Sequence, residues 1–228
     1  MRQVQKFIPF ILLTLISIPS WAVAQDADTI LKRVRYQQTA NEVKLRGKLR
    51  VDRETHPFVL TWDGGVMRYD FKLPAKAYLF RFGNSGANIT EITRMGRDSI
   101  GRGRRDEELY DSGMTFEDLA LEFLYWNNAQ LLGDDFLRTR NVWKIRVRPG
   151  NRQSSYAEVI LWVDKKTYAL MRVEGYDRAG RLLKKMEVLE VQQLPETWAL
   201  KRMRMEAYDP ARGRVRQRSY LEIEGSAR

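Results

Sequence analysis

Apolar and polar residues alternate along much of the chain. Val43, Leu45, Leu49 and Val51 alternate with basic residues between positions 43 and 51. A period of two places the apolar side chains on one face of a β-strand and the polar ones on the other. The same period predicts strands at residues 58–62, 66–73, 78–82 and 89–94. Residues 63–65, Asp-Gly-Gly, suit a hairpin turn between the first two of these.

The last ninety or so residues form a series of predicted hairpins. Strands are predicted at residues 142–148, 156–164, 168–176, 181–192, 200–208 and 214–224, with short turns between them. Short turns make neighbouring strands antiparallel partners. Within 159–163, apolar residues occupy both faces of the strand, which suits a curved sheet covered on each side. The pattern predicts a mainly β protein of the α+β kind, a half-open antiparallel β-barrel of about ten or eleven strands enclosing a cavity.

Two helices accompany the strands. The first follows Asp26 and Asp28, and its Ile30, Leu31 and Val34 share a face. The second starts with a capping box of Thr115 and Asp118 and runs to about residue 126. It is apolar on nearly every side, which predicts burial as a permanent plug or as a mobile lid of the cavity. Residues 130–136 add a further helical turn, and most of 83–113 is expected to be loop.

The first 24 residues have the composition of a secretory signal. Arg2 and Lys6 precede an apolar stretch over 7–21, and Ala22-Val23-Ala24 provides a small-x-small cleavage pattern. We expect cleavage after Ala24, which leaves residues 25–228 as a single exported domain. The expected location is the periplasm.

Composition excludes several kinds of chemistry. The chain has no cysteine, so it has no disulfide, thiol nucleophile or zinc–thiolate site. Its single histidine, His56, precedes Pro57 and has no nearby nucleophile signature, which argues against a Ser-His-Asp triad. The acidic runs at 106–108 and 134–135 lack a metal-ligand pattern. We therefore expect no enzyme activity, no catalytic residue, no metal and no cofactor.

Three stretches resemble a known family. They are residues 27–51, the helix start Gly-Met-Thr-Phe-Glu-Asp-Leu at 113–119, and the hairpins over 162–174 and 201–223. Together they resemble the LolA-like outer-membrane lipoprotein-sorting proteins. The resemblance implies a half-open barrel whose apolar cavity shelters acyl chains of lipoproteins or other lipids, with an inner-membrane transporter or an outer-membrane acceptor as partner. The family's lid-holding arginine has no single counterpart here, because arginines are numerous in this chain. Arg46 and Arg50 lie in the corresponding strand, but the alternation places them on its outer face.

Large flexible and aromatic side chains are the candidates for the cavity lining and lid. Methionine suits a pocket that accepts varied chains. Ordinary core packing is the better explanation for any one of these residues, whereas the resemblance to a half-open barrel favours a cavity for the group. The candidates are Met67, Tyr69, Phe71, Tyr78, Phe80, Phe116, Leu119, Phe123, Leu124, Trp126, Trp162, Met171, Met186, Met203 and Met205.

The chain is strongly basic, with a net charge of +11. Export makes nucleic acid an unsuitable partner. The basic stripe of the first strand is either a solvated outer face or a surface for anionic lipid headgroups or an acidic partner. It consists of Lys44, Arg46, Lys48 and Arg50.

Two functions from different classes fit these features. The first is a periplasmic carrier of lipid or lipoprotein acyl chains, for lipoprotein sorting or lipid transport. The second is an envelope sensor or regulator that uses the same fold to bind lipid or a membrane-protein partner. The sequence leaves the cargo and the oligomeric state open.

Overall fold

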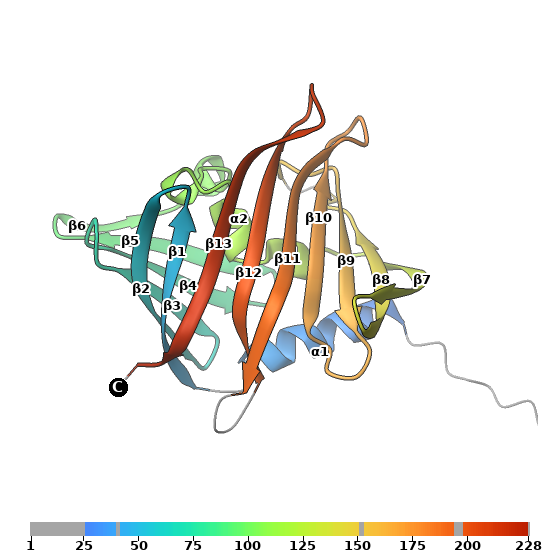
Figure 1. The fold of residues 1–228 in the computed structure, drawn as a ribbon, viewed down its shortest axis with the longest axis horizontal. Coiled ribbons are helices and arrows are strands. Elements are labelled where there is room, and N and C mark those ends of the chain that lie inside the picture. The colour runs from blue at the N-terminus through green and yellow to red at the C-terminus, as the bar shows by residue number, and fades with distance from the viewer. Residues whose placement is uncertain (1–25, 40–41, 151–152, 194–197, 228) are drawn as a thin grey trace, which may run out of the picture.

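In the described part of the chain, thirteen antiparallel strands form one sheet that does not close on itself. The computed structural model describes residues 26–39, 42–150, 153–193 and 198–227. The strand order is β6-β5-β4-β3-β2-β1-β13-β12-β11-β10-β9-β8-β7, so β1 pairs with β13 and every other neighbour is consecutive in sequence. Figure 1 shows β6 and β7 at opposite ends of the sheet. The predicted half-open antiparallel barrel is confirmed, with thirteen strands in place of ten or eleven.

The elements follow the chain in a simple order. One helix, α1 (Ala27–Thr39), precedes six strands: β1 (Val43–Val51), β2 (Glu54–Asp63), β3 (Val66–Phe71), β4 (Lys76–Gly83), β5 (Gly86–Thr93) and β6 (Gly96–Ser99). Short helices follow: η1 (Arg102–Arg104), η2 (Leu109–Asp111), α2 (Phe116–Leu119) and η3 (Glu122–Tyr125). The remaining strands are β7 (Gln130–Leu137), β8 (Arg140–Val147), β9 (Glu158–Asp164), β10 (Leu170–Tyr176), β11 (Leu182–Gln193), β12 (Trp198–Asp209) and β13 (Arg214–Ser226).

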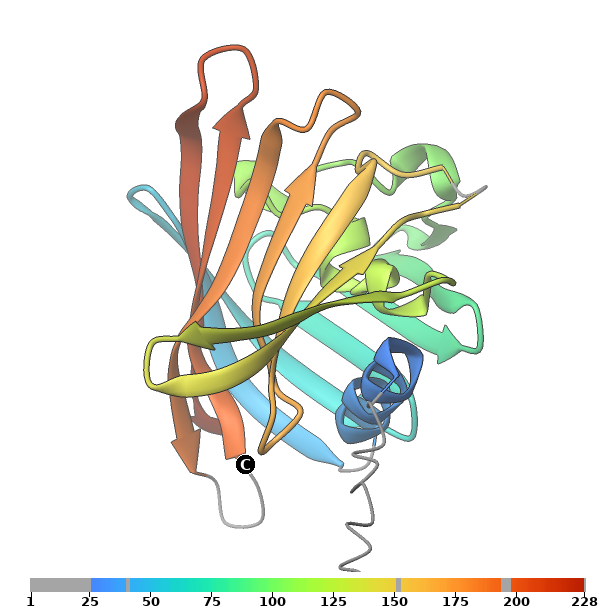
Figure 2. The same cartoon turned by 90° about the vertical axis from the view of Figure 1, so that its right-hand side faces the viewer.

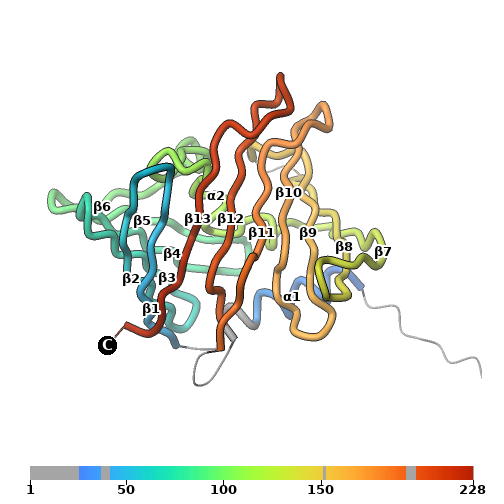
Figure 3. The backbone as a smooth tube through the Cα atoms, in the orientation of Figure 1, coloured from blue at the N-terminus to red at the C-terminus, as the bar shows by residue number. Residues whose placement is uncertain are grey.

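The sheet curls so that its concave side faces the helices. Figure 2 shows β3–β5 crossing behind the strands of the second half, with α1 at the open side and α2 between the two halves. The tube in Figure 3 follows the same path from β1 through the curled hairpins to β13, which returns beside β1. The apolar faces of strands distant in sequence therefore share one interior.

The join between β1 and β13 depends on a glycine. A Cβ atom at Gly47 would lie 2.6 Å from the carbonyl oxygen of Glu222 and 2.6 Å from the ring of Phe58. The register of β1 against β13 shifts at this point, between Arg46 and Gly47. Glycine is the residue that lets a ring and a neighbouring backbone approach a strand so closely.

The single central helix expected over residues 116–126 is wrong. The capping box forms as expected, with Thr115 accepting from the Asp118 amide and the Asp118 carboxylate accepting from the Thr115 amide. The helix then stops, because Leu121 adopts a left-handed conformation with φ of +48°. Two short helices, α2 and η3, result. Both are nevertheless buried, as the all-round apolar pattern requires.

Two other expectations about local structure are also wrong. Residues 130–136 belong to strand β7, which pairs with β8, and do not extend a helix. The strand expected at residues 89–94 forms as β5, which begins earlier at Gly86, whereas β6 lies in the segment expected to be loop. The tight turns before these two strands use Gly86 and Gly96 at positive φ. Glycine at positive φ is typical of tight hairpin turns as well as of irregular loops, so the glycines of this segment do not distinguish the two.

The expected signal segment, residues 1–24, lies outside the described residues. Among the helices that the structure does describe, none has the length and apolar character needed to cross a bilayer.

Candidate functional site: the apolar interior of the half-barrel

One large cluster of buried apolar side chains fills the concave side of the sheet. It draws on most strands, on α1 and on the segment that holds α2 and η3. Most of the candidates named from the sequence meet here. They are Met67, Tyr69, Phe71, Tyr78, Phe80, Phe116, Leu119, Phe123, Leu124, Trp126, Met186 and Met205, with Met203 packed against them.

Aromatic rings form one wall of this interior. Phe58, Tyr69, Phe71 and Phe80 lie on neighbouring strands with ring centroids 5.3 to 6.4 Å apart. Most of these contacts are edge-to-face or tilted, the arrangements that aromatic quadrupoles favour. The ring of Tyr78 then contacts Phe116 of α2 at 5.1 Å. Alternate positions of β2, β3 and β4 supply the wall, because side chains on one face of a strand are two residues apart.

Two candidates lie elsewhere. Trp162 and Met171 belong to a second apolar cluster, on the opposite face of the sheet from Leu161 and Val173. The Trp162 indole donates to Asp135 at 2.8 Å and carries Lys144 and Arg172 over its ring. Neighbours on a strand point to opposite faces, so Trp162 faces outward when Leu161 faces in. These two residues do not line the interior.

The N-terminal helix covers the open side of the interior. Ile30 and Leu31 of α1 have no exposed surface, and Ala27 and Val34 are buried beside them. These four belong to the interior cluster. The apolar stripe expected from the spacing of Ile30, Leu31 and Val34 is the face that packs inward. In this structure the chain's own helix occupies the position where the half-barrel opens.

Two arginines of α1 reach the walls of the opening. The Arg33 guanidinium donates to the Tyr168 hydroxyl at 2.7 Å and lies over its ring. Arg35 donates to the carbonyl oxygen of Leu124 and lies 5.4 Å from the centre of the Tyr125 ring. Arg35 therefore ties α1 directly to η3. The sequence did not single out Arg35, because only its helical position and the fold bring it to that carbonyl.

The segment with α2 is fixed to the sheet by buried polar contacts. Asp118 is 1% exposed and accepts hydrogen bonds from the Tyr156 hydroxyl at 2.6 Å and from Lys184 of β11 at 2.8 Å. Ser219 of β13 donates to the carbonyl oxygen of Ser112 at 2.8 Å. A buried carboxylate with a cation and a hydroxyl as partners is costly to uncover. Composition gave no sign of Lys184 or Tyr156 as partners, because they lie far from Asp118 in sequence.

A second carboxylate in this segment is buried, and no cation among the residues that the structure describes is in hydrogen-bond contact with it. Glu117 is 2% exposed and accepts from Ser154 at 2.5 Å and from Ser155 at 3.2 Å. Burial raises the pKa of the Glu117 carboxyl, although the two serines oppose the rise. Adjacent residues of α2 thus contact the loop before β9, Glu117 through the hydroxyls of Ser154 and Ser155 and Asp118 through Tyr156, while Asp118 also pairs with Lys184 of β11.

Glu117→Gln should make the fold more stable at neutral pH. The raised pKa of the Glu117 carboxyl means that the folded state favours the neutral form. The resulting stability is present below the ordinary carboxyl pKa and is lost as the pH rises through the folded-state pKa. Glutamine imitates the neutral form: its Oε1 accepts from one serine, and its Nε2 can donate to the hydroxyl oxygen of the other. Thermal unfolding should give equal midpoints for variant and wild type at acid pH and a higher midpoint for the variant at neutral pH. A variant less stable at neutral pH would contradict this assignment.

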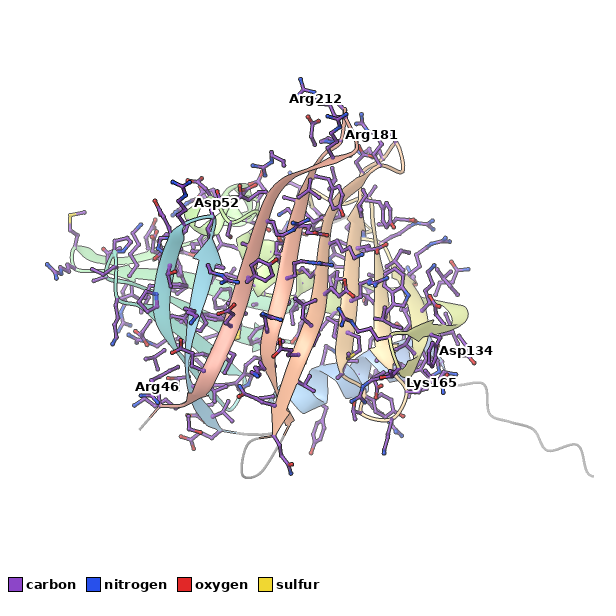
Figure 4. The ribbon with its side chains drawn as sticks, in the orientation of Figure 1. Arg46, Asp52, Asp134, Lys165, Arg181 and Arg212 are labelled. Atoms are coloured by element: carbon purple, nitrogen blue, oxygen red, sulfur yellow. The ribbon has the colours of Figure 1, made fainter. Side chains whose placement is uncertain are left out.

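The basic stripe of β1 is partly neutralised by β13. Lys48 pairs with Glu222 and Glu224, and Arg50 pairs with Glu222. Lys44 and Arg46 have no ion-pair partner among the described residues, and Figure 4 shows Arg46 at the lower edge of the sheet. Much of the chain's positive charge is held in such pairs on the outer face, so the stripe is less charged than its sequence implied.

Glu187 is the largest centre of these outer pairs. It is buried, and Arg138, Arg172 and Arg204 approach its carboxylate at 3.4, 3.1 and 3.0 Å. Although burial opposes ionisation, the hydrogen bond and charge of Arg172 lead the effects that lower the pKa of the Glu187 carboxyl. The outer face of β10–β12 is therefore an ion-pair lattice, while the inner face is apolar.

One surface cleft of the described residues lies away from the apolar interior. This cleft of about 480 Å³ lies beside Tyr156, lined among others by Arg148, Ser154 and Arg178. No group of three or more histidine, aspartate or glutamate side chains within residues 26–39, 42–150, 153–193 and 198–227 is arranged to hold a metal ion.

Comparison with known proteins places this geometry in a family. A family model described as "Uncharacterized protein" matches residues 97–223, more than half of the chain. A search of curated proteins finds no match.

Solved structures share the fold at low sequence identity. A domain assigned as an outer membrane lipoprotein-sorting protein from Vibrio parahaemolyticus is 18% identical, with a TM-score of 0.74 over 87% of this chain and 90% of that one. A DUF1329 family protein from Desulfovibrio piger is 17% identical, with a TM-score of 0.72 over 87% and 90%. A LolA superfamily protein from Nitrosomonas europaea is 17% identical, with a TM-score of 0.66 over 88% and 92%. The chain belongs to the family whose model spans residues 97–223, and its half-open barrel has the LolA-like fold.

Proposed function

We propose that this protein is an exported carrier that binds acyl chains of lipids or lipoproteins inside the half-barrel, in the place that the apolar face of α1 occupies here. The proposal rests on the position of α1. This helix, with fully buried Ile30 and Leu31, lies over an interior lined by aromatic rings and methionines. Such a helix imitates a hydrocarbon ligand. Transport between membranes, for lipoprotein sorting or for lipid transfer, is the role that fits a LolA-like fold.

The energetics of the exchange favour a long acyl chain. Burying three aliphatic side chains such as Ile30, Leu31 and Val34 stabilises the closed form by roughly 5–8 kcal/mol. An acyl chain of about sixteen carbons gains about 12 kcal/mol on full burial, at about 0.8 kcal/mol per methylene. A long chain can therefore replace α1, while a short one gains too little. The flexible side chains of Met186 and Met205 can adjust to the new occupant.

The α2–η3 segment acts as the fixed floor in this proposal. Its anchors, the Asp118–Lys184 pair and the Tyr156 hydroxyl, are buried, whereas Arg33 of α1 is exposed at the surface. Breaking an exposed polar contact costs little, because water replaces the lost partner. Breaking a buried one costs more, because the groups stay without a partner. The mobile lid is therefore α1 in our proposal, and the central segment is the plug.

No catalytic step is proposed. His56 stacks on Tyr110 at 4.2 Å and its Nε2 lies 3.5 Å from the Glu54 carboxylate. That arrangement provides a ring contact and an acidic neighbour but no nucleophile. Binding and release of cargo require only the apolar interior and its cover.

Native mass spectrometry of protein recovered from the periplasm tests the proposal. We expect a population that retains lipid and a shift to the free mass after delipidation. A fluorescent fatty acid should then bind the delipidated protein, with affinity rising as the chain lengthens from about eight to about sixteen carbons. Protein that carries no lipid and binds no acyl probe of any length would contradict the proposal.

A further inference from the structure

Two hairpin turns expose apolar side chains at the same end of the sheet. Leu73 in the β3–β4 turn is 72% exposed, and Met95 in the β5–β6 turn is 98% exposed. Strands β4 and β5 are hydrogen-bonded partners, with Ala77 opposite Ile92. The two turns begin a few residues beyond that pair on the same side. The β5–β6 turn projects at the left of Figure 1.

Hydrogen bonds hold the backbone of both turns in place. The Lys72 amide donates to the carbonyl oxygen of Pro57 at 3.1 Å, and a ring nitrogen of His56 lies 3.4 Å from the carbonyl oxygen of Leu73. The Met95 amide donates to the Thr93 hydroxyl at 3.2 Å. These contacts engage the backbone and leave the Leu73 and Met95 side chains in solvent. Each turn thus presents one apolar side chain on a fixed support.

Unpaired basic side chains flank both apolar tips. Lys72 precedes Leu73, while Arg94 and Arg97 bracket Met95, and all three are exposed. None of the three forms an ion pair with the residues that the structure describes, although the nearby Lys76 pairs with Glu91. The end of the sheet therefore combines protruding apolar groups with free positive charge.

We propose that this end of the sheet is a docking surface for an anionic lipid bilayer. Leu73 and Met95 enter the boundary between headgroups and acyl chains, while Lys72, Arg94 and Arg97 contact the anionic headgroups. Weak hydrophobic insertion and a basic patch each bind marginally, and together they give useful, reversible attachment. An acidic protein surface would match the charges but would offer no apolar layer to the two protruding tips. This inference does not rest on the proposed carrier function.

Vesicle co-sedimentation of protein recovered from the periplasm tests the docking surface. The probes are vesicles of phosphatidylglycerol and phosphatidylethanolamine in equal parts, and vesicles of phosphatidylcholine alone. We expect binding to the anionic vesicles that weakens with added salt, and little binding to phosphatidylcholine. The variant Leu73→Ser/Met95→Ser should bind about tenfold more weakly. The variant Lys72→Gln/Arg94→Gln/Arg97→Gln should bind roughly a hundredfold more weakly, at about fivefold for each charge.

Matched controls come from the opposite end of the molecule. Phe136→Ser/Lys166→Gln changes one exposed apolar and one exposed basic residue near β7, and should bind as the wild type does. Thermal midpoints should be equal for all variants, because the altered side chains are exposed. The proposal is overturned if the control loses as much binding as the test variants, if wild type does not distinguish the two vesicle types, or if polyglutamate competes as well as anionic lipid. Acyl-chain binding in the interior is measured in a separate experiment. The outcome of the vesicle assay therefore does not depend on whether the protein binds acyl chains.

Discussion

Leu124→Glu should lower the free energy of unfolding by about 4 kcal/mol or more, enough to unfold much of the protein at ordinary temperature. Leu124 has no exposed surface and lies in the interior cluster with Phe123 and Trp126. The change removes the burial of a leucine and places a carboxylate among the apolar side chains of the interior cluster. Urea unfolding followed by circular dichroism measures the effect.

A surface leucine provides the control for this change. Leu73→Glu makes the same substitution at an exposed position and should change the unfolding free energy by less than about 0.5 kcal/mol. Were Leu124→Glu to fold as stably as Leu73→Glu, the α2–η3 segment would be able to leave the interior at little cost. The assignment of that segment as a fixed plug would then be wrong.

Strand content was predictable because burial on one side imposes a period of two. The six C-terminal strands lie within two residues or so of the expected ranges, and the alternation of β1 matches its burial. The prediction was wrong for β7, an edge strand that lacks this period. Strand β7, with Gly133 and Asp134 in its middle, carries little alternation and is specified by its pairing with β8.

The central helix shows the limit of capping and composition as signals. The Thr115–Asp118 capping box and the run of large apolar residues are real features of the structure. Neither feature predicted the left-handed backbone conformation of Leu121, which separates α2 from η3. That conformation depends on the packing of the two short helices around it. Burial of the segment was predictable from its apolar surface, and its continuity was not.

For a strand that is apolar on both faces, the sequence does not reveal which face lines the interior. Leu161 and Trp162 are equally apolar neighbours, yet only Leu161 points inward. The register of β9 between β8 and β10 decides the matter, and that register involves residues distant in sequence. For the same reason, the cover over the interior and the contact of Arg35 with Leu124 emerge only from the fold.

Locking α1 in place should abolish acyl-chain binding. Because the chain has no cysteine, Arg33→Cys/Tyr168→Cys provides two unique thiols where α1 meets the β9–β10 turn. A short bis-maleimide with an internal disulfide can bridge them across the gap left by the two side chains. The bridged protein should bind a sixteen-carbon fluorescent fatty acid more than about a hundredfold more weakly than the same variant before bridging, because a covalent tie removes the open form.

The control bridge joins two other contacting side chains. Asp134 and Lys165 form an ion pair at 2.6 Å and lie side by side at the lower right of Figure 4. Asp134→Cys/Lys165→Cys, bridged by the same reagent, ties β7 to the β9–β10 turn without touching α1. Its fatty-acid binding should equal that of the unbridged protein.

The decisive measurement is fatty-acid affinity of the bridged Arg33→Cys/Tyr168→Cys protein before and after reduction of the bridge. Binding that is absent while α1 is tied and returns when the reagent is cleaved is the predicted result. Equal affinity in both states would contradict the account, because hydrocarbon would then enter a half-barrel whose covering helix had never moved.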